Sequence, residues 1–526
     1  MSDTTTGEIH SGALAPSMDV PAPSAATSTR RWWVLAVLCL SLFLVVVDNT
    51  IVNVALPTLS TDLNAGTTEL QWIVDAYTLV FAALLLAFGH LGDRFGRKGA
   101  LQLGMALFAL TSVLAALSAT SGQLVSARAL MGIGAALVFP ATLAILVNVF
   151  TDRKERAAAI GIWSGVTGLA VALGPVSGGY LLEHFWWGSI FLVNVPIAVV
   201  AILGAAWFVP TSRDPDTRAM DWWGLITSAA AVALLVWAII EGPRVGWTST
   251  EVLLAGGFAL ALLSVFILWE RRCRHPLLDV SIFSNLRFSA ASGAVAAAFF
   301  GLFGFIFLIT QFMQLVQGYS PLEAGLRTVP FALATALTAP IAIAVMHRVG
   351  STLVVGGGLL LMSAGFLLAS RIEADSDYFG IVLASMVVMA VGLGLTTGPA
   401  TESIMGALPA AKAGVGSAVN DTTRELGGTL GVALVGSVFA SVYAPKLREA
   451  VAPLGLPQRV QDAAAESMGS ALVVVQQLPR GVADEFIHMA QRAFMDGFTR
   501  GSLVAAAATL IGGIAVFLFL PARHAE

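Results

Sequence analysis

Charged residues are scarce in this chain of 526 residues, because Asp, Glu, Lys and Arg make up only 11% of it. A typical soluble domain carries about 25% of these residues. Hydrophobic residues account for 57% of the sequence, and its mean hydropathy is +0.83. This composition excludes a soluble globular protein and predicts a polytopic integral membrane protein. The net charge of −4 is small and does not bear on nucleic-acid binding, since the position of the charges matters more. We expect no nucleic-acid partner.

Cysteine is equally rare. Cys39 falls inside an apolar run and Cys273 lies among arginines, so the pair provides neither a disulfide framework nor a thiolate metal site. A phosphate-binding loop of the form G-x-x-x-x-G-K-[ST] is missing from the sequence, and no polar stretch is long enough to house an ATPase. We therefore expect no catalytic residues, no metal and no cofactor. Any transport has to draw on an ion gradient.

Long hydrophobic runs dominate the chain instead. A membrane-spanning helix needs about 20 predominantly apolar residues, and hydropathy predicts fourteen such spans. They lie near residues 32–56, 70–90, 99–119, 123–149, 156–182, 188–208, 220–240, 250–269, 288–315, 322–346, 352–371, 379–404, 413–443 and 500–520. Residues 1–29 are rich in Ser, Thr, Ala and Pro, and we expect a disordered cytoplasmic tail there.

The distribution of Lys and Arg tests this count and orients the chain. If the N-terminus is cytoplasmic, the cytoplasmic connections and the two ends hold 17 of the 28 Lys and Arg residues. The short loops on the opposite side hold only Arg244 and Arg371. Because positive residues accumulate on the cytoplasmic side of membrane proteins, both termini are predicted to be cytoplasmic.

One connection, residues 444–499, is much longer than the others and falls on the outer side. Its stretches 458–477 and 482–497 are amphipathic, so we expect short interfacial helices there. The acidic residues and the histidine of this connection form no recognisable catalytic constellation.

A short charged turn separates the second and third predicted spans. Residues 89–98 read Gly-His-Leu-Gly-Asp-Arg-Phe-Gly-Arg-Lys, which places three glycines and four charges between two apolar runs. Glycines allow two helices to approach closely, and charges at helix ends can pair in the polar interface.

This turn resembles the hallmark loop of the major facilitator superfamily, G-x-L-x-D-R-x-G-R-[KR], at every fixed position. Four further stretches resemble motifs of its fourteen-span drug:proton antiporter branch, in the expected order: residues 47–57, Arg128 with Gly132 and Gly134, residues 174–179 and residues 424–431. The resemblance covers roughly residues 32–520. His347 departs from it, because an Asp would stand there in the second-half counterpart of the loop. Met131 departs as well, at a position that is often Gln.

The resemblance implies an all-α membrane protein with the major-facilitator fold, in which two six-helix bundles are joined by two extra central helices. The N-terminal bundle would comprise residues 30–208, the extra pair with its connections 209–287, and the C-terminal bundle 288–520, before a cytoplasmic tail at 521–526. Substrate would bind between the bundles near the midplane, and rocking of one bundle against the other would alternate access.

Charged residues inside the spans are the candidates for proton coupling. A charge at the bilayer centre costs about 2.5–3.5 kcal/mol and normally needs a cavity or a partner. Asp48 and Arg128 lie in the first and fourth spans, and the resemblance implies a proton relay at Arg128. Asp421, Arg424 and Glu425 share one face of the thirteenth span, where the arginine can neutralise one carboxylate and leave the other free to titrate. The alternative is a static ion-pair network that fixes helix packing.

A substrate site is predicted around Asp75, about one turn into the second span. Trp72 and Tyr77 can supply an aromatic wall for a cation, and Phe303 in an aromatic-rich span can line a cavity. The alternatives are a hydrated carboxylate near the interface and aromatic side chains that face lipid or core.

Gating is assigned to the two glycine-containing motifs. The loop is expected to act as a latch that stabilises the outward-open state, and the fifth span is expected to form a tight, kinked helix at the bundle interface. The residues concerned are Gly89, Asp93, Arg94, Gly96, Arg97 and Lys98 in the loop, and Gly174, Pro175, Gly178 and Gly179 in the span.

We therefore expect a monomeric, proton-coupled antiporter of the plasma membrane that exports amphipathic or cationic small molecules and confers antibiotic resistance. Its partners would be such substrates, protons and membrane lipid. An exporter of lipids or endogenous metabolites with the same fold is the alternative, and a polytopic membrane enzyme is a remote one.

Overall fold

A computed structural model describes residues 25–213, 220–408 and 413–521. In these residues all regular secondary structure is helical, and 14 helices are long and apolar enough to cross a membrane, which confirms the predicted number of spans. The predicted N-terminal tail lies largely outside the described residues, and the first helix begins at Ala25, slightly before the tail was expected to end.

The N-terminal half contains six spans. They are α1 (Ala25–Asp62), α2 (Thr67–Phe95), α3 (Arg97–Ala116), α4 (Ser121–Val149), α5 (Arg153–His184), and the short α6 (Ser189–Leu192) followed by α7 (Asn194–Phe208). Helix α4 packs on α2 and α3, and α1 packs on α5. Side-chain caps mark the helix starts, since Thr120 and Asp152 accept backbone N–H groups of the first turns of α4 and α5.

The C-terminal half repeats this arrangement. Its spans are α10 (Leu286–Gln311), continued by a π-helical turn (Phe312–Val316), α11 (Pro321–Val349), α12 (Ser351–Ala369), α13 (Leu383–Gly406), α14 (Ala413–Val451) and α17 (Arg480–Phe519). A capping box formed by Ser320 and Glu323 begins α11. Helices α12 and α13, α10 and α14, and α12 and α17 are packed pairs.

Two further spans, α8 (Trp222–Val245) and α9 (Thr250–Glu270), pack against each other and lie between the halves in sequence. Helix α8 contacts both α2 and α14, so it covers the seam between the halves. A 3₁₀ turn (Val280–Ser284) then leads into α10.

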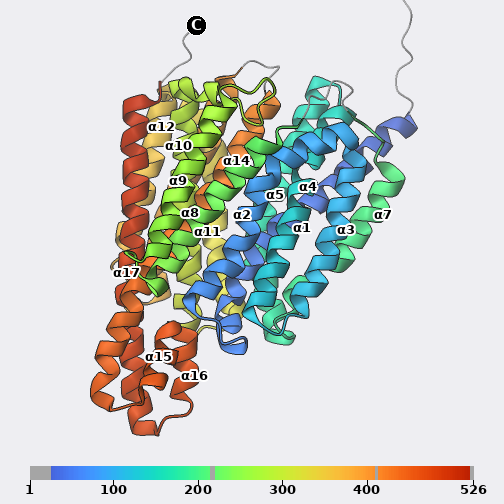
Figure 1. Ribbon diagram of the computed structural model, residues 1–526. Helices are drawn as coiled ribbons and strands as arrows, with labels where there is room; N and C mark the ends of the chain where they lie inside the picture. The colour runs from blue at the N-terminus through green and yellow to red at the C-terminus, as the bar shows by residue number, and fades with distance from the viewer. Residues whose placement is uncertain (1–24, 214–219, 409–412, 522–526) are drawn as a thin grey trace, which may run out of the picture.

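The long outer connection differs from the prediction. Two short helices, α15 (Gln458–Glu466) and α16 (Met468–Val475), form at its centre, as Figure 1 shows at the bottom of the molecule. Residues 482–497, however, form no separate interfacial helix, because they belong to α17, which continues without a break into the last span. The reason is burial of one helical stripe: Phe494 and Phe498 are fully buried, and Phe494 packs edge-on against Phe439 of α14.

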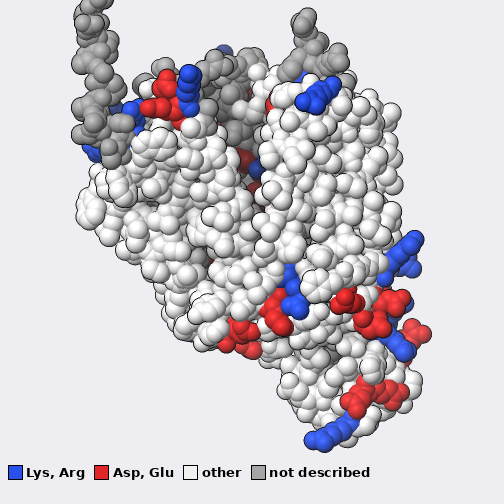
Figure 2. All heavy atoms as spheres, turned by 180° about the vertical axis from the view of Figure 1, so that it is seen from behind, with Lys and Arg blue, Asp and Glu red and all other residues white. Residues whose placement is uncertain are grey.

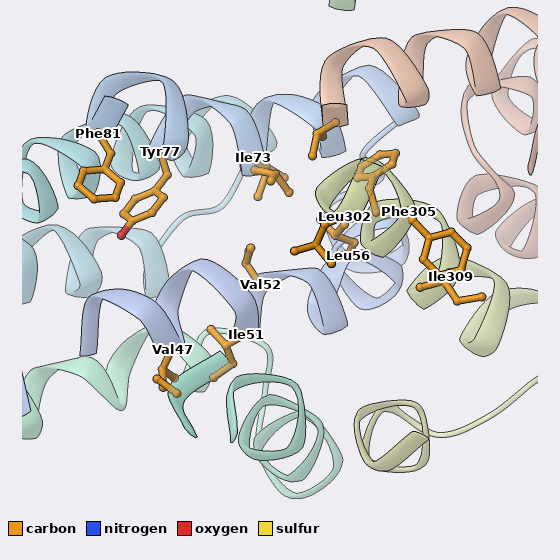
Figure 3. Packing of buried hydrophobic residues seen from close by; sticks show 14 of the residues in the cluster. Val47, Ile51, Val52, Leu56, Ile73, Tyr77, Phe81, Leu302, Phe305 and Ile309 are labelled. Carbon is orange, nitrogen blue, oxygen red and sulfur yellow. The ribbon is translucent and has the colours of Figure 1, made fainter. Parts of the chain in front are cut away.

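The two halves meet mainly through α5 with α11 and α2 with α14. Small residues allow the closest approach, since a Cβ atom built on Gly325 of α11 would lie 2.3 Å from the carbonyl oxygen of Pro175 in α5. Apolar contacts also join α1 to α10, where Leu56 and Leu302 lie (Figure 3).

A hollow separates the halves at one end of the molecule. The start of α1 and the end of α17 lie at the same end of the bundle, opposite α15 and α16 (Figure 1). Figure 2 shows that the surface is hollowed between the halves at the first of these ends, and that charged atoms are visible inside the hollow. The halves are therefore joined near α15 and α16 and separated near the chain ends.

Candidate functional site: charged residues within the helices

Asp48 of α1 and Arg128 of α4 form an ion pair inside the N-terminal half. Both side chains are 0% exposed, and the Arg128 Nη1 to Asp48 Oδ2 distance is 2.5 Å. The other carboxylate oxygen accepts a hydrogen bond of 2.8 Å from the amide of Asn194, at the start of α7. Both oxygens of Asp48 are thus partnered, whereas Nη2 of Arg128 has no hydrogen-bond partner among the described residues. The pair lies in the interior of one bundle and does not line the hollow.

Aromatic and backbone groups complete the surroundings of Arg128. Its Nε donates to the carbonyl of Ile73 at 3.1 Å, and its guanidinium carbon lies 4.3 Å from the centroid of the Tyr77 ring. Tyr77 projects from α2 toward α1 (Figure 3), where its hydroxyl donates to the carbonyl of Val45 at 3.2 Å. Four helices, α1, α2, α4 and α7, therefore converge on this one buried charge.

Asp75 of α2 is in the opposite situation. Its side chain is 0% exposed, and neither carboxyl oxygen has a hydrogen-bond partner among the described residues. Its neighbours on the same face of α2 contact α14: Gln71 donates to the carbonyl of Ala433 at 2.8 Å, and Thr78 bonds to Thr429 at 2.9 Å. Asp75 is therefore a buried carboxyl group without a partner, at the interface between the halves.

The expected aromatic wall around Asp75 does not form. Trp72 turns toward α8, where its Nε1 donates to Glu241 at 3.3 Å, while Tyr77 turns into the N-terminal half under Arg128. Tyr77 lies two positions after Asp75 and therefore points to the other side of α2. Trp72 lies three positions before Asp75, on the neighbouring side of the helix, with its indole N–H directed at α8. The prediction that Tyr77 flanks Asp75 is wrong in this structure, and the substrate contact of Trp72 stays a prediction.

The charges of α14 are linked to one another through polar side chains. Arg424 donates from Nη2 to Thr401 Oγ1 of α13, and Thr401 donates in turn to Asn420, each at 3.2 Å. The Asn420 amide lies 3.4 Å from Asp421 Oδ1, so arginine and aspartate are joined by a chain of hydrogen bonds. Asp421, Arg424 and Glu425 are all only half-buried, unlike Asp48 and Asp75.

Glu425 connects this cluster to the N-terminal half. Its carboxylate hydrogen-bonds the side chain of Asn49 in α1, and its Oε2 has no partner among the described residues. The guanidinium of Arg424 lies 5.3 Å from the ring centroid of Phe299, on which Phe303 stacks. The structure thus brings Phe303 to the side of the α14 charges, whereas Asp75 lies on the α2 face that packs on α14.

The charged turn after α2 contacts the N-terminal half and the connection that follows α7, where the backbone N–H of Arg97 donates to the carbonyl of Ser212 at 3.0 Å. Asp93 accepts a bond of 2.6 Å from Arg97 Nε across the turn, and Lys98 Nζ donates to the carbonyl of Ala206 in α7 at 2.9 Å. Gly96 has a φ of 120°, a conformation that favours glycine and allows α3 to begin directly after α2. The expected pairing across the bundle interface is absent from the described residues, and the hollow lies at this end of the molecule.

The glycines of α5 lie where close approach was predicted. A Cβ atom on Gly174 would lie 1.9 Å from Thr50 Oγ1 of α1, and one on Gly179 would lie 2.5 Å from the carbonyl oxygen of Pro321 in α11. Helix α5 is therefore packed between its own half and the opposite one, with Gly178 against Ile51. Their gating role stays a prediction.

Sequence reasoning missed the polar partners of these charges. Asn49, Thr401, Asn420 and Asn194 contact them. Asn194 is a lone polar residue in an apolar run, which was a usable signal, whereas the other three stand directly beside charged residues. No cluster of three or more His, Cys, Asp or Glu side chains suited to a metal occurs in the described ranges.

The fold and these buried charges define a multi-pass membrane transporter with two helical halves. Residues 38–432 match the family model of the Major Facilitator Superfamily, and the chain belongs to this superfamily. It is 37% identical to the multidrug efflux pump LfrA of Mycolicibacterium smegmatis over 93% of this chain and 97% of that protein. It is 34% identical to the methyl viologen resistance protein SmvA of Salmonella typhimurium (89% and 93% covered). These relatives place the chain among the efflux transporters of the superfamily.

Among the solved structures, a bacterial homologue of the lysosomal transporter Spinster in an inward-facing conformation has a TM-score of 0.62. It is 17% identical and covers 94% of this chain and 99% of its own length, so the likeness concerns the fold alone.

Proposed function

We propose that this protein exports amphipathic or cationic small molecules from the cytoplasm in exchange for protons, by alternating access. The observation that carries the proposal is Asp75, a fully buried carboxyl group without a partner at the interface that must open and close. An unpaired charge in such a place is very costly, so Asp75 is held neutral by a proton while α2 and α14 are packed together.

The orientation of the chain gives this interface a direction. The Lys and Arg bias places both termini in the cytoplasm, and the hollow opens at the end where α1 begins and α17 ends (Figures 1 and 2). With this orientation, we infer an inward-open state, and we propose that the protein acts as a monomer in the plasma membrane. Separation of α2 from α14 would expose Asp75 to the outer solution, where it can exchange its proton.

The half-buried charges of α14 suit the substrate-facing part of this cycle. Asp421 and Glu425 outnumber Arg424, so the cluster carries an excess of negative charge for a cation. Phe299 and Phe303 lie beside it and offer an apolar surface to the rest of an amphipathic molecule. Asp48 and Arg128 would then couple protonation to helix positions within the N-terminal half, without touching the substrate.

The relatives support a cationic or lipophilic cargo. One of them confers resistance to methyl viologen, a dication, and another, 32% identical, is the tetracenomycin C resistance and export protein of Streptomyces glaucescens. A lipid or an endogenous metabolite as cargo is the alternative, and it would use the same fold and the same hollow between the halves.

The test compares Asp75→Asn with the wild type in proteoliposomes that contain a pH-sensitive dye. Addition of methyl viologen or a neutral lipophilic compound should evoke proton flux in the wild type. Asp75→Asn should lose most of the proton flux evoked by either compound, because Asp75 carries the exchanged proton in this proposal. Asp62→Asn, the same change at an exposed residue at the end of α1, is the matched control and should behave as the wild type.

Two results would overturn the proposal. Wild-type proton flux in Asp75→Asn with both compounds would refute a proton-carrying role of Asp75. Lipid movement by the wild type without any cation-evoked proton flux would show that the cargo is a lipid.

A further inference from the structure

Two carboxyl groups meet at the ends of the central helices, far from the charges described above. Asp221 immediately precedes α8, Glu270 is the last residue of α9, and their side chains are 8% and 3% exposed. The two carboxyl groups hydrogen-bond each other. A Cβ atom built on Gly224 would lie 2.3 Å from Glu270 Oε1 and 2.7 Å from Asp221 Oδ2, so glycine leaves the space that the two oxygens occupy.

The other contacts of this pair account for three of its four oxygens. Asp221 Oδ1 accepts the backbone N–H of Gly224 at 2.9 Å, and the Trp269 indole donates to Asp221 Oδ2 at 2.9 Å. Glu270 Oε2 accepts the backbone N–H of Leu278 at 3.2 Å. Glu270 Oε1 finds no donor among the described residues and faces the carboxyl group of Asp221.

This geometry calls for a proton between the two groups. Ionised carboxylates are acceptors only, so two of them can hydrogen-bond only if one carries a proton. Two like charges in contact and shielded from water also repel, which keeps one member of such a pair neutral. Among the charged side chains of the described residues, Asp221 is the one that interacts electrostatically with Glu270. The basic residues Arg271, Arg272 and Arg274 next to Glu270 are exposed. His275 is exposed as well.

The pair ties together the two connections that link the central helices to the halves. Asp221 ends the connection from α7, and Glu270 begins the connection to α10, which it also holds through Leu278. Loss of the shared proton would leave two charges in contact and release Glu270 toward solvent. The backbone N–H of Leu278 would then lose its partner, and residues 271–285 would be freed from α8.

We propose that Asp221 and Glu270 form a proton-sharing clasp that restrains the connections between the halves and opens when the cytoplasm becomes alkaline. An inward-directed proton gradient makes the cytoplasm the more alkaline side, so the clasp would release the halves for rocking when the driving force is present. The cytoplasmic location rests on the orientation given under the proposed function.

A native thiol offers a readout that does not depend on transport. Cys273 is partly exposed in the released segment, and the second cysteine, Cys39, is buried. The rate of Cys273 labelling by a water-soluble maleimide should be measured in the full-length protein from mildly acidic to mildly alkaline pH. Thiolate formation raises the labelling rate with pH in every variant. The informative quantity is therefore the labelling rate of the wild type divided by that of Glu270→Gln. This variant keeps a neutral, hydrogen-bonding side chain at all pH values.

This ratio should rise severalfold with pH. Asp221→Asn retains an N-cap side chain and, like Glu270→Gln, should show a smaller increase of the labelling rate with pH than the wild type. Glu251→Gln in the exposed first turn of α9 is the control, and its labelling rate should rise with pH as in the wild type. Exchange of labelled substrate at equal pH on both sides should show a matching loss of alkaline activation in Glu270→Gln.

A ratio that stays constant with pH would overturn the clasp, whatever the transport result. A rising ratio in a protein that shows no proton-coupled transport would leave the clasp standing and refute the proposed function instead.

Discussion

Three kinds of environment hold the acidic residues of the spans. Asp48 is buried and both of its oxygens are partnered, whereas Asp75 is buried and has no hydrogen-bond partner among the residues that the structure describes. Asp421 and Glu425 are half-buried beside an arginine. The cost of charge in a low-dielectric interior separates their expected roles. We expect the fully partnered residue to fix helices, the unpartnered one to carry a proton and the half-buried ones to meet the substrate.

Replacement of Arg128 by methionine tests the buried pair. Arg128→Met leaves the charge of Asp48 uncompensated, which should lower the free energy of unfolding by about 3–5 kcal/mol. The double variant Asp48→Asn with Arg128→Met removes both charges and should regain part of this loss. Denaturant unfolding in detergent provides the measurement, with the exposed Arg480→Met as the control.

A double variant as unstable as Arg128→Met alone would contradict this account. Transport at the wild-type rate by a well-folded double variant would show that the pair is structural and takes no part in proton coupling.

The sequence identified most of these charges but not their partners. A charge inside an apolar run is visible in the sequence, and Asp48, Asp75, Arg128 and Glu425 were all found in this way. Their pairing depends on which helices meet, and Asp48 and Arg128 are 80 residues apart. The direction of a side chain around its helix decided against the aromatic wall, because Trp72 faces α8 and Tyr77 faces Arg128.

At the scale of the element, α5 and α11 determine how closely the halves approach. Gly325 and Gly179 allow backbone contact between them, so any side chain there pushes the halves apart. This contact exists only while the end near α15 and α16 is closed, so its loss should favour the opposite state.

Gly325→Ala should therefore shift the protein toward the outward-open state. The added Cβ would lie 2.3 Å from a backbone oxygen, and overpacking of this kind costs about 1–3 kcal/mol. A cysteine at Thr78, in a Cys273→Ser background, should react faster with an impermeant thiol reagent added from outside. Gly165→Ala in α5, where nothing lies within 4 Å of the added atom, is the control.

An unchanged labelling rate in Gly325→Ala would show that the interface absorbs the methyl group. An equal increase in Gly165→Ala would mean that the effect comes from helix propensity and not from the contact.

Helix existence was easier to predict than helix ends. Apolar runs of bilayer length indicated all fourteen spans, since the hydrophobic requirement acts on each segment alone. The outer end of α17 was misjudged because residues 482–497 look amphipathic. Their apolar stripe packs on the outer extension of α14, through Phe439 and Phe494, and does not lie on a membrane surface.

At the scale of the whole molecule, α15 and α16 join the two halves on the closed side. They belong to the C-terminal half by sequence but touch the turn between α1 and α2. Ser467 Oγ lies 2.9 Å from Ser60 Oγ, and Thr67 donates to the carbonyl of Glu466 at 3.0 Å. Opening of this side requires these contacts to break.

A cross-link between Ser60 and Ser467 should therefore hold the closed side shut. In the double variant Ser60→Cys and Ser467→Cys, oxidation should abolish substrate exchange, and a reductant should restore it. Substrate binding from the cytoplasmic side should survive, because the hollow lies at the other end. The two single variants serve as controls, and exchange at the wild-type rate by the oxidised double variant would show that α15 and α16 move together with the N-terminal half.

The length of α17 has a pharmacological consequence. Its 40 residues extend about 60 Å, roughly twice the hydrocarbon thickness of a bilayer, so it carries its outer part and the neighbouring short helices well clear of the lipid. An antibody fragment raised against this protruding epitope would never need to enter the cell. By holding α16 against the α1–α2 turn, the antibody fragment would stop transport without competing with any substrate. Mutations in the hollow where substrate binds would therefore not confer resistance to it.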